Sequence, residues 1–161
     1  DLLELSGGSY ESPAMQGRTA DGRSLAREAY FLEFAASLAQ QARMPLMTTG
    51  GIRRRAVAEQ VITQGVAIAG MATALTLVPD LPARWQAGEN TEASVPAVTW
   101  SDKAMAALAT MAVIKRQLRR LGARRNSKPQ ASPLFSLILD RLRIKRLTRR
   151  YQHWLKQTGS L

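Results

Sequence analysis

Two glycine turns, each following a short apolar segment, are the residues of this sequence best suited to bind a phosphate. Gly50-Gly51 follows the apolar segment 45–49, and a second turn containing Gly70 follows the apolar segment 65–69. Glycine lets the backbone approach a phosphate closely, and N–H groups of a turn and of the following helix donate hydrogen bonds to it. The two turns therefore predict one phosphate site built by two neighbouring strands.

Apolar periodicity predicts the elements that position these turns. Strands are expected at 1–5, 46–49 and 66–69, helices at 25–42 and 56–63, and a short helix at 72–77 that the prolines of 79–82 end. The alternation of strands and helices predicts a parallel sheet with right-handed crossovers. Phosphate turns after the last two strands are typical of a (β/α)8 barrel, which needs roughly 250 residues. With 161 residues, the chain is expected to be the C-terminal part of a longer protein.

The charge divides the chain in two. Residues 1–100 hold 8 Lys/Arg and 10 Asp/Glu (net −2), whereas residues 101–161 hold 15 and 2 (net +13). A helix is expected to begin near Ser101 or Asp102 and to end with a Gly122 cap, and a second begins at Ser132-Pro133. The side chains expected to be buried by the first of these helices are Met105, Leu108, Met111, Ile114, Leu118 and Leu121.

Composition excludes several classes of chemistry. The chain has no cysteine and a single histidine, His153. Disulfides and thiolate chemistry are therefore excluded, and no metal site is expected. No signal peptide is visible, and the longest apolar run, 65–78, is too short to span a membrane. We expect a cytoplasmic protein.

Four motifs in order resemble the C-terminal part of the old yellow enzyme family, the NADH:flavin oxidoreductases with an FMN-binding TIM barrel. They are Glu4-x-Ser6-Gly7-Gly8-x-Tyr10, Arg27 to Ala35 (REAYFLEFA), Thr48-Thr49-Gly50-Gly51, and Gly70-Met71-Ala72 followed by Leu75 and Pro79 to Pro82.

The resemblance implies an α/β fold: about three βα units of a (β/α)8 TIM barrel at 1–88, a linker at 89–100 and a basic α-helical extension at 101–161. It also implies FMN as cofactor, NAD(P)H as reductant and a small-molecule electron acceptor. Gly50, Gly51, Gly70 and Ala72 would hold the FMN phosphate, Ile52 would lie beside the flavin ring, and Ser6, Gly7 and Tyr10 would form part of the substrate rim.

The sequence departs from the family pattern at two positions. Thr73 stands where the family usually has an arginine that clamps the phosphate, and Ala67 stands where it usually has an aspartate. A charge-assisted contact of that kind contributes about 1.5–3 kcal/mol. Arg53, at the start of the helix after Gly51, could replace part of it. The family's catalytic residues lie mainly on earlier strands, so no catalytic residue is assigned here.

Two alternatives stay open. The chain could be a non-catalytic or degenerate barrel fragment that acts through its basic tail, because basic amphipathic helices bind nucleic acid or anionic membranes. Alternatively, the same turns could bind a sugar phosphate in another barrel. The tail's ordinary interpretation is a helical pair with solvated charges, which we favour, and an exposed sheet edge predicts homo-oligomers.

Overall fold

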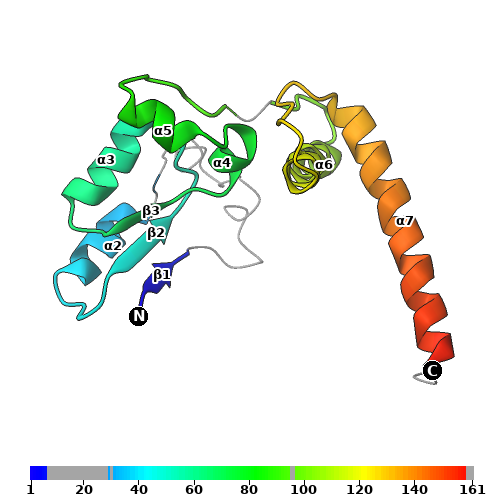
Figure 1. Ribbon diagram of the computed structural model, residues 1–161, viewed down its shortest axis with the longest axis horizontal. Helices are drawn as coiled ribbons and strands as arrows, with labels where there is room; N and C mark the ends of the chain where they lie inside the picture. Colours follow the sequence, from blue (N-terminus) through cyan, green and yellow to red (C-terminus); the bar gives the residue numbers. More distant parts are fainter. Residues whose placement is uncertain (7–28, 30, 95–96, 159–161) are drawn as a thin grey trace. The chain divides into compact units, whose positions relative to one another are not determined.

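The computed structural model describes residues 1–6, 29, 31–94 and 97–158. The chain divides into two units, residues 1–95 and 96–161. Within the described residues, unit 1 combines a small parallel sheet with four helices, and unit 2 contains two long helices (Figure 1). The predicted loop after residue 6 and the first turn of the helix predicted at 25–42 lie outside the described residues.

The sheet of unit 1 has three parallel strands in sequence order. β1 is Leu3–Leu5, β2 is Leu46–Thr49 and β3 is Ile68–Gly70, and β2 lies in the middle. The parallel pairing confirms the prediction from strand and helix alternation. The third strand was predicted at 66–69 and begins two residues later, at Ile68. Of residues 66–69, only Val66 is deeply buried.

In the described residues of unit 1, each strand is followed by a helix. α2 (Leu32–Ala39) follows β1, α3 (Arg55–Thr63) follows β2, and α4 (Thr73–Leu77) and α5 (Leu81–Gln86) follow β3. The helix predicted at 25–42 is shorter, since Ala29 has a left-handed φ of 52° that no continuous helix contains. The short helix predicted at 72–77 is confirmed as α4, which ends at Leu77, before Pro79. Helix α5 was not predicted, and it accommodates Pro82 in its first turn, where no N–H is needed.

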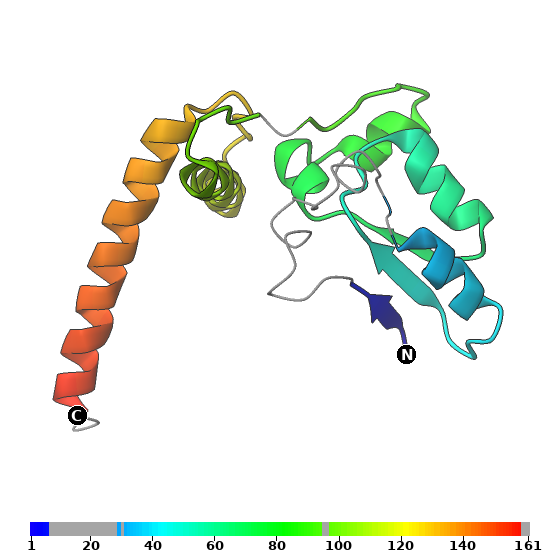
Figure 2. The same ribbon diagram turned by 180° about the vertical axis from the view of Figure 1, so that it is seen from behind.

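One face of the sheet carries the core of unit 1. Leu46 and Thr48 of β2 are 2% and 0% exposed, and the buried residues of α2 and α3 pack with Leu46 in one cluster. The opposite face bears Glu4, Met47 and Ile68 in register, and Ile68 is 42% exposed. Of the described helices, α2 and α3 pack on the face that bears Leu46 (Figures 1 and 2).

Unit 2 begins its two helices where the sequence predicts. α6 (Lys103–Gly122) is capped by Asp102, whose carboxylate accepts hydrogen bonds from the N–H groups of Ala104 (2.9 Å) and Met105 (3.0 Å). α7 (Pro133–Gln157) is capped by Ser132, which accepts a hydrogen bond from the Phe135 N–H at 3.3 Å. Both N-cap predictions are confirmed.

The buried face of α6 differs from the prediction. Met105, Leu108, Met111 and Leu118 are 38–53% exposed, and Ile114 and Leu121 are half-buried. The residues that α6 buries instead are Ala106, Ala109, Ala112, Val113 and Gln117. The small alanines allow α7 to approach closely, with Leu137 packed against Ala109 and Ala112. The helix ends through Ala123, not a Gly122 cap, and Arg124 takes the left-handed conformation.

α7 contacts α6 only through its first two turns. Its buried residues are Ser136, Leu137 and Asp140, and residues 141–154 are all exposed. Within unit 2, α6 is seen nearly end-on while α7 runs across the view, so the helices cross steeply (Figure 2). Among the described residues, no helix is long and apolar enough to cross a membrane.

Candidate functional site

The two glycine turns leave the same edge of the sheet. β2 and β3 are parallel neighbours, and Thr49 pairs with Gly70 at their carboxyl ends. The turn at Gly50-Gly51 and the turn at Met71-Ala72 therefore start side by side. Ligands of parallel sheets bind at the carboxyl ends of strands, so this edge is the candidate site.

The conformation of the first turn requires glycine. Gly50 has φ 150° and Gly51 has φ 70°, values that residues with a Cβ rarely adopt. Gly50 is buried and Gly51 is exposed. A Cβ added at Gly51 would meet no atom within 4 Å. The space beside Gly51 is therefore open to a ligand.

Gly70 has a different reason to be glycine. A Cβ at this position would overlap the Cγ2 atom of Thr49 and would lie 3.2 Å from the carbonyl oxygen of Thr48. The β2 chain thus fills the space that a side chain would need. The absence of a Cβ keeps the two strand ends close together.

Long-range contacts fix the first turn from both sides. The Ala29 N–H donates a hydrogen bond to the Gly50 carbonyl oxygen at 2.7 Å. Ile52, directly after the glycines, is 2% exposed and packs in the core with Leu32 and Val61. The Ile52 side chain thus belongs to the core, and the position of Ile52 beside a flavin ring stays a prediction.

Three arginines surround the start of α3. Arg54 occupies the N-cap position, and no side chain caps the helix. Arg53 forms an ion pair with Glu92 (Nε to Oε1, 3.3 Å), and Arg55 forms one with Glu59 (2.6 Å). Cations are unfavourable at a helix N-terminus, so an anion bound there would relieve the repulsion. Arg53 is half-buried and lies two residues after Gly51.

The second turn carries no charge. Ala72 and Thr73 are exposed, and α4, which starts at Thr73, has five residues. The Ala72 carbonyl oxygen accepts hydrogen bonds from the N–H (3.1 Å) and the hydroxyl (2.9 Å) of Thr76. These bonds hold the turn against the helix and leave the Thr73 side chain at the surface.

Ser6 lies at the same edge as the turns. It directly follows β1, is exposed, and β1 runs parallel to β2, so its strand ends where the glycine turn begins. Gly7 and Tyr10, predicted with Ser6 to form the substrate rim, lie outside the described residues.

The described residues offer no catalytic constellation at this edge. They contain no group of three or more His, Cys, Asp or Glu side chains that could hold a metal ion. The clearest titration effect in unit 1 is at Asp80, where a hydrogen bond from Arg84 (2.9 Å) lowers the carboxyl pKa. This exposed pair lies within one turn of α5 and faces no cleft, so we assign it a local structural role.

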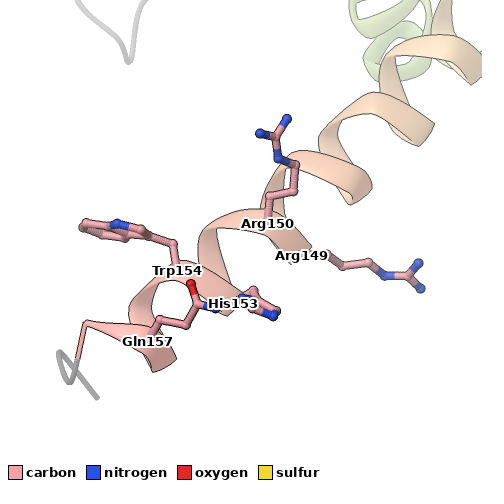
Figure 3. Close-up of a pocket in the computed structure, with 5 residues that line it drawn as sticks. All are labelled: Arg149, Arg150, His153, Trp154 and Gln157. Atoms are coloured by element: carbon pink, nitrogen blue, oxygen red, sulfur yellow. The ribbon is translucent and has the colours of Figure 1, made fainter.

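The surface of α7 belongs to the basic amphipathic tail that the sequence predicts. Two shallow open hollows run along this helix, and one is lined by Arg149, Arg150, His153, Trp154 and Gln157. Figure 3 shows Trp154 projecting to one side of the helix and Arg149 and His153 to the other. These hollows lie beside a single helix and enclose no ligand, so we do not consider them catalytic pockets.

Comparison with known proteins connects the chain with flavin chemistry. It is 36% identical over 88 residues to a protein of Hypocrea jecorina (strain QM6a) named NADH-dependent flavin oxidoreductase iliE. It is 34% identical over 91 residues to a protein of the same name from Neonectria sp. (strain DH2). Each match covers 51% of this chain but only 22% and 12% of the relatives. The chain is thus similar, over half its length, to small parts of two flavin oxidoreductases.

The other two comparisons give no match. No protein-family model matches the sequence, and no solved structure matches it.

Proposed function

We propose that residues 1–88 are the last three βα units of an FMN-dependent NAD(P)H oxidoreductase barrel of the old yellow enzyme type. In this proposal the two glycine turns hold the FMN phosphate. One observation carries it: the pairing of Thr49 with Gly70 brings both turns to one sheet edge, in a chain similar to proteins named flavin oxidoreductases.

The local structure is compatible with a phosphate. Gly51 faces open space, so the backbone of the first turn is accessible, whereas Thr49 fills the space beside Gly70 and keeps the two strand ends close together. Arg53 supplies positive charge beside Gly51 and can exchange its exposed partner Glu92 for a phosphate. The uncharged Thr73 would contribute at most a hydroxyl hydrogen bond, which is weaker than an arginine contact.

The open face of the sheet also supports a barrel. Parallel sheets normally have both faces covered, whereas no described helix packs on the face with Glu4, Met47 and Ile68, and Ile68 is exposed. In a barrel this face would point inward, opposite the helices. Further strands would supply the missing cover.

The chain's own role in the reaction is to bind and orient the cofactor. FMN, when bound, provides hydride transfer from NAD(P)H to an electron-poor small molecule. Gly50, Gly51 and the turn after Gly70 would fix the phosphate end. In this proposal, the groups that contact the ring and protonate the substrate lie on strands outside this chain.

Comparing FMN with riboflavin tests the phosphate site directly, because the two differ only in the phosphate. Flavin fluorescence titrations of the chain should show tighter binding of FMN. Gly51→Asp would place a carboxylate at the site and should remove this preference. Gly65→Asp is the matched control: Gly65 also has a positive φ (89°) and open space, but lies after the other end of α3.

The control separates strain from binding. Both variants should lose similar stability, since both force a Cβ into a left-handed conformation. Only Gly51→Asp should weaken FMN binding, by roughly tenfold or more, which corresponds to one charge-assisted contact. Equal affinity for FMN and riboflavin in the unmodified chain would refute the proposed phosphate site.

A further inference from the structure

The exposed part of α7 continues the face that packs on α6. Residues 137, 140, 144, 147, 151 and 154 follow each other at alternating spacings of three and four, which places them on one side of a helix. The first two, Leu137 and Asp140, are buried against α6. The next four have no such cover, and Ile144, Leu147, Tyr151 and Trp154 are 44–58% exposed. We call these four residues the apolar stripe.

The same segment is strongly cationic. Residues 141–157 contain no Asp or Glu, and their seven cations are Arg141, Arg143, Lys145, Arg146, Arg149, Arg150 and Lys156. Figure 3 shows the separation at the C-terminal end, where Trp154 and Arg149 point to opposite sides. An apolar stripe bordered by cations fits a surface that is apolar inside and anionic outside.

We propose that residues 141–157 of α7 lie on an anionic lipid surface, with the apolar stripe at the boundary between headgroups and acyl chains and the cations at the headgroups. Amphipathic helices of this composition bind in the plane of the interface. Tyr151 and Trp154 stack with their ring centroids 5.8 Å apart, and such amphipathic rings favour the headgroup level. The inference is independent of the flavin proposal, because it uses only unit 2.

The charges argue against two other occupants. A second copy of the helix would bring its arginines beside those that flank the stripe, such as Arg143 and Arg150, and like charges would repel. A nucleic acid would pair with the cations through its phosphates but would leave the four apolar side chains in water. An anionic lipid surface, in contrast, satisfies both faces of the helix.

The experiment uses the full chain and vesicles of phosphatidylcholine with or without phosphatidylglycerol. We expect co-sedimentation with the anionic vesicles, weak binding to the neutral ones, and loss of affinity as salt increases. Trp154 emission should shift to shorter wavelength on binding. Trp154→Phe should bind but lack this shift, which distinguishes Trp154 from Trp85 and Trp100.

Two variants with the same change in charge separate the lipid from the other partners. Leu147→Glu changes the apolar stripe, and Gln152→Glu is the control on the cationic face; both positions are exposed. Gln152→Glu should cost about fivefold in affinity, the effect of one surface charge. Leu147→Glu should lower the affinity roughly tenfold more than Gln152→Glu does, because it also removes a leucine that the lipid would bury.

Three results would overturn the proposal. One is equal binding to neutral and anionic vesicles. Another is that the chain binds duplex DNA but not vesicles, and that Leu147→Glu and Gln152→Glu weaken DNA binding equally. The third is an oligomer that forms without lipid and that Leu147→Glu dissociates.

Discussion

Asp140 of α7 accepts a hydrogen bond from Arg119 of α6 at 2.9 Å, and Lys115 lies 3.5 Å from its other carboxylate oxygen. The Asp140 side chain is 8% exposed, whereas its two partners are 32% and 46% exposed. This cluster joins α6 and α7 at the last turn of α7 that α6 covers. A carboxylate here compensates two cations of a strongly basic unit.

Unit 2 should lose stability in acid through Asp140. Burial opposes ionisation of this carboxyl, but the hydrogen bond from Arg119 and the charges of Lys115 and Arg119 outweigh it, so the pKa is lowered. A lowered pKa contributes stability above the unfolded value of about 3.9, and this is lost as pH falls through the folded value. Circular dichroism melts should show it as a decrease in Tm below about pH 4.

Asp140→Asn should lower stability at neutral pH by about 1–2 kcal/mol and should flatten this acid dependence. The decrease in Tm is specific to Asp140 only if the variant lacks it. An Asp140→Asn chain with the same Tm as the unmodified chain, both at neutral pH and below about pH 4, would contradict the assigned role.

Gly70→Ala should destabilise unit 1 by about 1–3 kcal/mol, the usual cost of overpacking. The new Cβ would overlap Thr49 Cγ2, so Thr49→Ser, which removes that methyl group, should recover part of the loss. The recovery appears as a coupling free energy in a double-mutant cycle. Gly122→Ala is the control, because a Cβ there meets nothing and should be neutral or stabilising. Additive effects of the Gly70 and Thr49 substitutions would show that the two do not interact.

The isolated chain should not oxidise NADH faster than free FMN does. In the proposed function the ring-binding and proton-donating residues lie outside the chain, and the described residues offer no substitute. Absorbance at the NADH band, followed with FMN present, measures the rate. Turnover above the free-FMN rate that Gly51→Asp abolishes would show that the chain contains a complete active site.

The uncovered sheet face should make the chain self-associate. Ile68 exposes apolar area on this face. In the described sheet, β1 and β3 each pair with β2 on one side only, and such outer strands are templates for further pairing. Light scattering should detect oligomers, and Ile68→Lys should reduce them. Ile62→Lys is matched in residue type and exposure (51% against 42%) but lies on α3, so it should have no effect. A monomeric chain, or equal effects of both lysines, would refute association through this face.

Sequence patterns predicted the order of elements better than their contacts. Alternating apolar segments and glycine turns predicted the parallel sheet, because each βα unit has a local signature. The face of α6 was predicted wrongly because hydrophobicity favoured Met105 and Leu108, whereas close packing against Leu137 requires the small side chains of Ala109 and Ala112. Helix α5 was missed because Pro82 was interpreted as a breaker.

The candidate site was predictable only in part. The glycines identify the turns, and their common edge follows from parallel topology. The burial of Ile52 depends on contacts with α2 and α3, which no local pattern contains. The hydrogen bond from Ala29 to Gly50 likewise joins residues 21 positions apart.

Residues 101–161 contain 15 Lys/Arg and two Asp/Glu, so the stability of unit 2 depends on the ionic strength of the solution. Both acids already have structural partners: Asp102 caps α6, and Asp140 binds Arg119 and Lys115. The remaining cations repel one another, and dissolved anions screen that repulsion. Unit 2 should therefore become more stable as ionic strength rises, so that counterions act as a component of its folded state.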